Sequence, residues 1–191
     1  MHVVTHLLTS WTLAQAAPLE RRDRAIVAWA GVAPDLDGAG LLIDWAHKGL
    51  GLSETAYYET WHHALGHGLP AALLAGVIAA ALARQRALTG LLALVSFHLH
   101  LLCDLLGSRG SSAVDIWPIP YFAPLSQHPM LFWGGQWPLT GWQNTGITVG
   151  LLVAACLIAM RRGESPLGLF SRKADAAFVA TLRRRFGGAA S

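Results

Sequence analysis

Apolar residues fall in runs of helical length along this chain, and several of these runs carry almost no charge. No charged residue occurs in 69–83, histidines are the only charge-bearing residues in 87–103, and Asp, Glu, Lys and Arg are all missing from 116–160. Such long apolar runs indicate buried or membrane-embedded helices. We predict helices over 3–17, 21–32, 70–83, 88–106 and 146–160. The third and fourth should form a hairpin around the basic turn at 84–86.

The segments between these helices have a different character. We expect 38–58 to be irregular, with a short helix near 41–47, and we find little β signal. Residues 107–143 form a long stretch rich in Pro, Gly and Trp. Loops of that length are uncommon in compact domains and often cover a functional site. Residues 173–186 read either as a basic amphipathic helix or as a disordered tail.

The predicted fold class is therefore all-α. It is a membrane-associated helical bundle over 1–165, followed by a basic tail over 166–191. Hydrophobic residues make up 53% of the chain and charged residues 13%, against about 25% charged in average proteins. A membrane span needs ~20 apolar residues. The last apolar run, 146–160, reaches this length when its uncharged flanks are included, and 69–83 is marginal. The alternative is a soluble all-helical protein with a large apolar core.

Charge placement favours the membrane. Only Lys48 and Arg109 fall outside the basic clusters, which lie at 21–24, 84–86, 161–162 and in the tail. When the chain is followed through its apolar helices, these basic clusters fall at one end of the bundle and most acidic residues fall at the other. Short basic loops stay in the cytoplasm. We therefore predict a bacterial inner-membrane protein with its acidic end on the extracytoplasmic side. The net charge of +3 then belongs to a cytoplasmic tail, and no nucleic-acid partner is expected.

His100 and Asp104 are the most informative pair in the chain. Spaced i and i+4, they lie on one face of the predicted helix, where they can share a metal ion. The alternative is a hydrogen bond between the two inside an apolar core. His98 lies two positions away on another face and should not be a ligand.

Further candidate ligands are spread along the chain. Imidazoles and carboxylates in this mixture are typical of mono- and dinuclear metal sites. The two cysteines, Cys103 and Cys156, form no CxxC pair, so a cysteine-type zinc site or a disulfide framework is not expected. The remaining candidates are His6, Asp35, Asp37, His62, His63 and His67.

These blocks together resemble a known family. The early His6, the PDLD turn at 34–37, the HHALGH segment at 62–67 and the HLLCD helix at 100–104 are followed by Gly110 and a Trp-Pro pair at 117–118. In this order they resemble the LexA-binding, inner-membrane-associated type of predicted membrane-bound metal-dependent hydrolases, over roughly 1–125. A more distant similarity is to zinc-dependent phospholipases C and single-strand nucleases.

The chain departs from these patterns at several positions. Gly38 replaces a His, and His63 stands where the family has Arg. The later HxxxE pair of the phospholipases is missing, since His128 is the only later His. One or two metal ions are therefore expected rather than three.

The resemblance implies a hydrolase with a divalent metal, zinc being the expected ion, acting on a phosphoester or lipid-linked substrate at the membrane. Asp104 would bridge or ligate, His100 and either His62 or His67 would ligate, and Asp35 would complete the set. His6 would hold the first helix to a second ion, and His63 or Asp37 could carry protons or support a ligand.

Arg109 follows the metal-binding helix and could bind a phosphate or carboxylate, or instead pair with Asp115 or Asp104. Two alternatives from other classes remain at this point. One is a non-enzymatic membrane protein with a structural metal site, and the other is an adaptor that acts through its basic tail.

Overall fold

The computed structural model describes residues 1–62 and 65–187, and within them the fold is a bundle of helices. A single small antiparallel pair of strands is the only sheet among the described residues, which confirms the all-α prediction. The elements are α1 (Val3–Ala16), α2 (Arg21–Ala30), the 3-10 turn η1 (Ala33–Ala39), α3 (Gly40–Gly49), α4 (Tyr57–Trp61), α5 (Leu69–Leu82), α6 (Arg86–Gly107), β1 (Ile119–Pro120), β2 (Met130–Leu131), α7 (Trp142–Arg162), η2 (Pro166–Leu169) and α8 (Arg172–Phe186).

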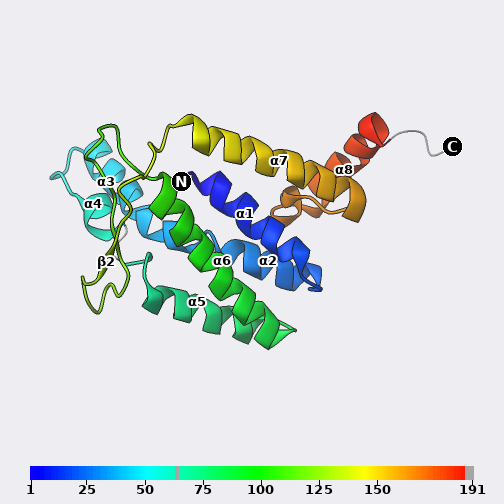
Figure 1. Cartoon of the computed structure of the whole chain (residues 1–191), viewed down its shortest axis with the longest axis horizontal. Helices are drawn as coiled ribbons and strands as arrows, with labels where there is room; N and C mark the ends of the chain where they lie inside the picture. Colours follow the sequence, from blue (N-terminus) through cyan, green and yellow to red (C-terminus); the bar gives the residue numbers. More distant parts are fainter. Residues whose placement is uncertain (63–64, 188–191) are drawn as a thin grey trace.

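The long helices lie along the long axis of the molecule (Figure 1). Helix α6 packs against α5, α2 and α1, and α7 packs against α1. As predicted, α5 and α6 form a hairpin. One end of the bundle carries α3, α4, the strands and the N-terminus, and the other carries α8 and the C-terminus (Figure 1). We call these the loop end and the tail end.

The core between the helices is built largely from small residues. Ala28 and Ala155 pack with Leu8 and Trp11 of α1, which joins three helices in one cluster. Alanines at such contacts let helix backbones approach closely, as is common inside membranes. The core is therefore thin, and large apolar side chains are left for the outside.

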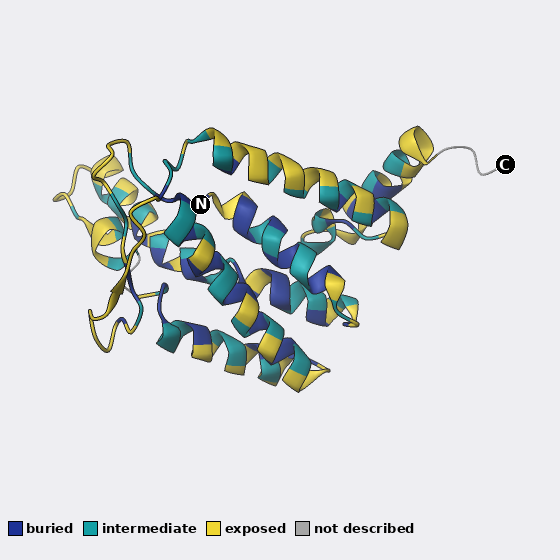
Figure 2. Ribbon diagram, viewed as in Figure 1, coloured by how far each residue is buried: buried dark blue, intermediate teal, exposed yellow. Residues whose placement is uncertain are grey.

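Many positions on α5 and α7 are exposed (Figure 2), and several of them carry apolar side chains. Leu74 and Val77 on α5 and Leu152 and Val153 on α7 are each at least 47% exposed. Contiguous apolar surface on this scale marks a membrane or protein contact. Helices α6 and α7, with 22 and 21 residues, are long and apolar enough to cross a bilayer, and α2 with η1 and α3 is a third, bent candidate. At ~1.5 Å per residue, α6 and α7 are each ~32 Å long, close to the ~30 Å hydrocarbon core.

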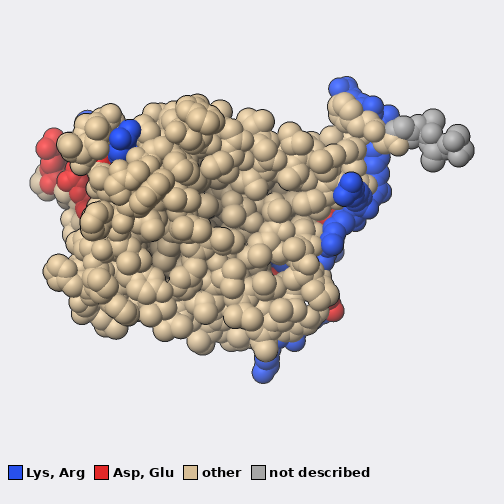
Figure 3. All heavy atoms as spheres, in the orientation of Figure 1, with Lys and Arg blue, Asp and Glu red and all other residues tan. Residues whose placement is uncertain are grey.

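Charges are sorted to the two ends of the molecule (Figure 3). The middle of the surface in this view lacks both signs, and the tail end is mostly basic. Ion pairs there tie the tail to the bundle: Arg24 lies 2.5 Å from Glu164, and Arg21 pairs with Asp175 of α8. Buried Asp23 accepts hydrogen bonds from the backbone N–H groups of Arg84 and Gln85, which fixes the α5–α6 corner against α2.

The structure differs from the sequence prediction mainly at the loop end. The segment 38–58 was expected to be irregular apart from a short helix near 41–47. That helix is found as the ten-residue α3, and the start of α4 was not predicted. Asp44 connects the two, because its carboxylate accepts hydrogen bonds from the Thr55 hydroxyl and from the backbone of Tyr57 and Tyr58. Helix α7 begins four residues earlier than predicted, and 173–186 is helical rather than disordered.

Candidate metal centre

Four segments bring imidazoles and carboxylates together at the loop-end side of the bundle core. Helix α6 supplies His100 and Asp104 one turn apart, and the neighbouring α1 supplies His6. The turn η1 follows α2 directly and carries Asp35 and Asp37. The segment between α4 and α5 contributes His62 and His67. Three groups of these side chains have ligand atoms within 4.8 Å of one another.

The tightest set surrounds the carboxylate of Asp104. Its Oδ2 lies 3.0 Å from His100 Nε2 and 3.5 Å from His67 Nε2, and its Oδ1 lies 3.1 Å from His6 Nε2. Asp35 Oδ1 is 3.7 Å from His100 Nε2. Ligands at ~2.0–2.1 Å from one tetrahedral ion would be about 3.3 Å apart. The observed separations scatter around that value, so the donor set fits a single zinc-sized ion.

Hydrogen bonds on the outer ring nitrogens fix how two of these histidines face the centre. His100 Nδ1 donates to the Gly31 carbonyl at 2.8 Å, and His67 Nδ1 donates to Asp37 at 2.9 Å. When both rings are neutral, each directs an Nε2 lone pair inward, and the two Nε2 atoms lie 3.2 Å apart. Facing lone pairs repel unless a proton or a metal ion lies between them. Outer-nitrogen contacts of this kind are the usual support of metal-binding histidines.

Other atoms of the set also lack partners that a metal would supply. His6 is fully buried, its ring stacks on His100 with centroids 3.6 Å apart, and neither of its nitrogens has a hydrogen bond. Asp35 Oδ2 is likewise buried without one. Buried polar atoms without partners are costly, and ligation would satisfy both residues. The residues present therefore fit a divalent metal.

The structure separates His62 from His67. His67 directs Nε2 at His100, whereas His62 directs Nδ1 at Asp37 Oδ1, 2.8 Å away, and its ring packs on Tyr58 and Trp117. Asp37 thus holds both imidazoles, and it also accepts a hydrogen bond from Gly66 N–H at 2.9 Å. The geometry favours His67 as the ligand, with Asp37 as its support and His62 beside the centre.

The electrostatics of this place favour a positive charge. Burial by itself lowers the pKa of His67, but hydrogen bonds with Asp104 and Asp37 outweigh it and raise the pKa to about 9. The imidazole therefore stays protonated at neutral pH when no metal is bound. The same carboxylates would stabilise a metal cation.

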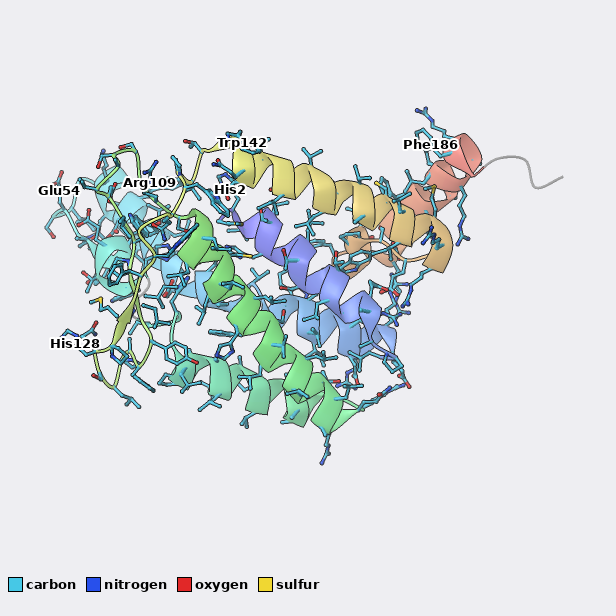
Figure 4. All side chains as sticks on the ribbon, viewed as in Figure 1. His2, Glu54, Arg109, His128, Trp142 and Phe186 are labelled. Atoms are coloured by element: carbon cyan, nitrogen blue, oxygen red, sulfur yellow. The ribbon has the colours of Figure 1, made fainter. Side chains whose placement is uncertain are left out.

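A cavity of about 340 Å³ opens beside the centre. Asp35 and Asp104 form part of its floor, and the loop after α6 forms one wall. It lies at the loop end, where Figure 4 labels His2 and Arg109. Its lining residues are Met1, His2, Val3, Asp35, Gly38, Tyr58, His62, Asp104, Ser108, Arg109, Gly110, Trp117 and Leu139.

Arg109 lines this cavity without a counter-ion. Among the described residues it forms no ion pair, so the predicted alternative of a pair with Asp115 or Asp104 is not found. Its Nε is buried and unpartnered. Its backbone is fixed by hydrogen bonds with Trp137 and Leu139. The guanidinium is therefore held beside the cavity with capacity for an anion.

The long loop after α6 is anchored by two buried amides. Gln136 donates to the carbonyls of Asp104 and Leu105, and its own carbonyl accepts from Trp117 N–H. Asn144 of α7 donates to the Gly107 carbonyl at 2.8 Å. These bonds satisfy free carbonyls at the end of α6 and hold the loop against the helix that carries Asp104.

The other predicted residues have these outcomes. His63 lies outside the described residues. His98 contacts the Leu94 carbonyl and the Tyr121 hydroxyl instead of the cluster, as expected from its helix face. Sequence reasoning missed Ser108, whose hydroxyl lies 2.9 Å from the Asp104 carboxylate. Ser108 follows Asp104 by four residues, and this i, i+4 spacing could have revealed it. It also missed Tyr58, which no local pattern marks.

Comparison with known proteins identifies a family that is described by its cellular location. The sequence matches the model of the YdjM inner membrane protein over residues 1–181. The chain belongs to the YdjM inner membrane protein family. No curated protein and no solved structure gives a significant match. The YdjM family description agrees with the predicted inner-membrane location and with the apolar outer faces of the helices. It names no reaction, so the resemblance to hydrolases belongs with the proposal below.

Proposed function

We propose that this protein is a metal-dependent hydrolase that cleaves a phosphoester, with a lipid-linked or amphipathic substrate. The observation that carries the proposal is the pair of inward-facing Nε2 atoms of His67 and His100, 3.2 Å apart, with Asp104 beside them. A cation is the group that best satisfies this arrangement, and imidazole with carboxylate is a donor set that zinc accepts.

The ligands divide into one principal position and one adjoining position. His67, His100, Asp35 and the Oδ2 of Asp104 form the principal position. His6 and the Oδ1 of Asp104, which also pairs with the Met1 ammonium, would hold a second ion. His100 can serve only one ion, because its other nitrogen is engaged by Gly31.

A divalent cation held by the principal ligands would act as a Lewis acid and would lower the pKa of a bound water to near ~7. Asp35 lies farther from His100 Nε2 than Asp104 does, and it lines the cavity. An open coordination position would therefore arise beside Asp35. An open position distinguishes catalytic zinc sites from closed structural ones.

The remaining roles follow from the cavity walls. In the reaction, a water oxygen bonds to phosphorus, the ester P–O bond breaks, and the departing alkoxide takes a proton. Arg109 would bind the non-bridging phosphoryl oxygens. His62, supported by Asp37 and lining the cavity, would accept and return the proton.

The location of the centre supports a membrane-derived substrate. The centre lies at the end opposite to the basic clusters, which the positive-inside rule assigns to the cytoplasm. The cavity would then open on the extracytoplasmic face, at the level where lipid head groups meet water.

Metal analysis of the purified protein in detergent, together with a phosphoesterase screen on soluble and lipid phosphoesters, tests the proposal. His100→Ala should remove both metal and hydrolysis, and the matched control His98→Ala should keep both. Arg109→Ala should keep the metal and raise KM. Stoichiometric metal without hydrolysis of any phosphoester would favour a structural metal site instead.

A further inference from the structure

A second hollow, separate from the cavity above the metal centre, lies between α2 and α5. Its volume is about 590 Å³, and it shares no lining residue with that cavity. Apart from Arg22 at one end, its walls are apolar. Residues Ala25, Ile26 and Trp29 of α2 face Ala75, Ile78 and Leu82 of α5.

The two ends of this α2–α5 groove differ. At the tail end, the Arg22 guanidinium donates to the Leu82 carbonyl at 2.8 Å and joins the two walls. At the other end the wall is Ala33 and Leu36 of η1. Leu36 lines the groove and its neighbour Asp35 lines the metal-site cavity. The groove and the cavity therefore meet across one turn of η1.

Both walls lead to ligands of the candidate metal centre. Helix α2 continues into the turn with Asp35, and α5 begins two residues after His67. Helix α2 spans ~12 Å from Arg22 to Ala30, and η1 extends the groove further. That length is close to half of the ~30 Å hydrocarbon core.

The setting of the groove identifies its occupant. Its walls are apolar, and they belong to a bundle whose outer faces expose apolar side chains. In a bilayer the molecule that covers such walls is the hydrocarbon chain of a lipid. Trp29, which is 42% exposed, gives the chain a broad apolar surface.

We propose that the α2–α5 groove binds one hydrocarbon chain of a phospholipid-like substrate, so that its phosphoester lies over η1 at the metal centre. This inference rests on the proposed hydrolase function for the identity of the substrate. It assigns the groove as the site that recognises the chain, and Arg22 with Leu82 as the closed end.

Photo-crosslinking tests the groove without requiring hydrolysis. The full-length protein is reconstituted in vesicles of phosphatidylethanolamine and phosphatidylglycerol that contain a phosphatidylglycerol with a diazirine in its acyl chain. Labelling of groove residues such as Trp29 and Ile78 should exceed labelling of the exposed α7 residues Leu152 and Val153 by about tenfold, which corresponds to ~1.4 kcal/mol of preference. Equal labelling of the two surfaces would mean ordinary surrounding lipid only and would overturn the proposal.

Variants that fill the groove provide the second measurement. Ala75→Phe and Ala25→Phe place a ring in it from opposite walls and should each reduce Trp29 labelling to the level of α7. Ala81→Phe, on the exposed face of α5 outside the groove, should leave the labelling pattern unchanged. Groove labelling that persists in both filled variants contradicts the proposal. If the groove is labelled in a metal-loaded protein that hydrolyses no phosphoester, the proposed hydrolase function is wrong and the chain-binding site is still supported.

Discussion

His62 and His67 contact the same carboxylate, but their second ring nitrogens lie in different surroundings. His67 turns its second nitrogen to His100, and His62 lies at the cavity wall. We expect His67→Ala to lower metal content to background, because it removes a ligand atom. His62→Ala should retain the metal and reduce turnover. Elemental analysis of the two purified variants measures this directly, and metal loss from both in equal degree would show that the ligand assignment is wrong.

Metal binding at this centre should depend on pH through His67. Its pKa of about 9 in the metal-free protein lies above the ordinary 6.5, so the ring carries a proton at neutral pH that the metal must displace. Ligands bind metals only after deprotonation. Apparent affinity should therefore rise with pH up to about 9, by up to about tenfold per unit for one proton. Metal titrations at several pH values measure the slope. A wild-type affinity independent of pH in this window would contradict the assignment.

At the scale of elements, the α5–α6 corner depends on one buried carboxylate. Asp23 accepts hydrogen bonds from Arg84 N–H, Gln85 N–H and the Thr89 hydroxyl. Asp23→Ala leaves these donors unpaired, which costs about 1–3 kcal/mol each at most. We expect a clear loss of stability in detergent unfolding experiments. Glu20→Ala, which removes only the exposed pair with Arg84, should cost less than about 1 kcal/mol. Similar losses in the two variants would show that the corner does not depend on Asp23.

The helices were predictable because their apolar runs are long and end at charged or Pro/Gly-rich segments. The α5–α6 hairpin follows from this pattern alone. The short helix predicted near 41–47 is part of α3, but the start of α4 was missed, because it depends on the Asp44 carboxylate reaching Thr55, Tyr57 and Tyr58 across a turn. The early start of α7 was also missed, since its first turn packs through Asn144 against the end of α6. Contacts between segments distant in sequence leave no local periodicity to detect.

The candidate site, like the fold, could be predicted from the sequence only in part. The i, i+4 pair His100 and Asp104 is visible in the sequence because one helix holds both residues. The choice between His62 and His67 was open, because Asp37 contacts Nδ1 of both rings and only the position of the second nitrogen of His67, 3.2 Å from His100 Nε2, separates them. The role of the Gly31 carbonyl in orienting His100 could not be predicted, because backbone carbonyls carry no sequence signature.

At the scale of the whole molecule, the two ends differ in the sign of their charge. Only Lys48 and Arg109 of the 14 Lys and Arg residues lie at the loop end. Seven of the 11 Asp and Glu residues belong to that end by position, namely Asp35, Asp37, Asp44, Glu54, Glu59, Asp104 and Asp115. A water-soluble bundle gains nothing from such separation. In a bilayer such separation would set the orientation, with the candidate metal centre and the basic tail on opposite sides.

The orientation leads to the prediction that the loop end faces outward and the tail end faces the cytoplasm, because short basic loops are retained inside. Ser112 and Gln85 are both exposed and lie at opposite ends, so they form a matched pair for cysteine labelling. A cysteine at Ser112 should react with an impermeant thiol reagent in intact cells, and one at Gln85 should react only after the membrane is permeabilised. The native Cys103 and Cys156 are only partly buried, so the same experiment on the unmodified chain sets the background.

Labelling of the Gln85 position alone would invert the orientation and place the candidate metal centre in the cytoplasm. Release of the protein from membranes by carbonate would show that α6 and α7 do not cross the bilayer, and the orientation prediction would fail with them.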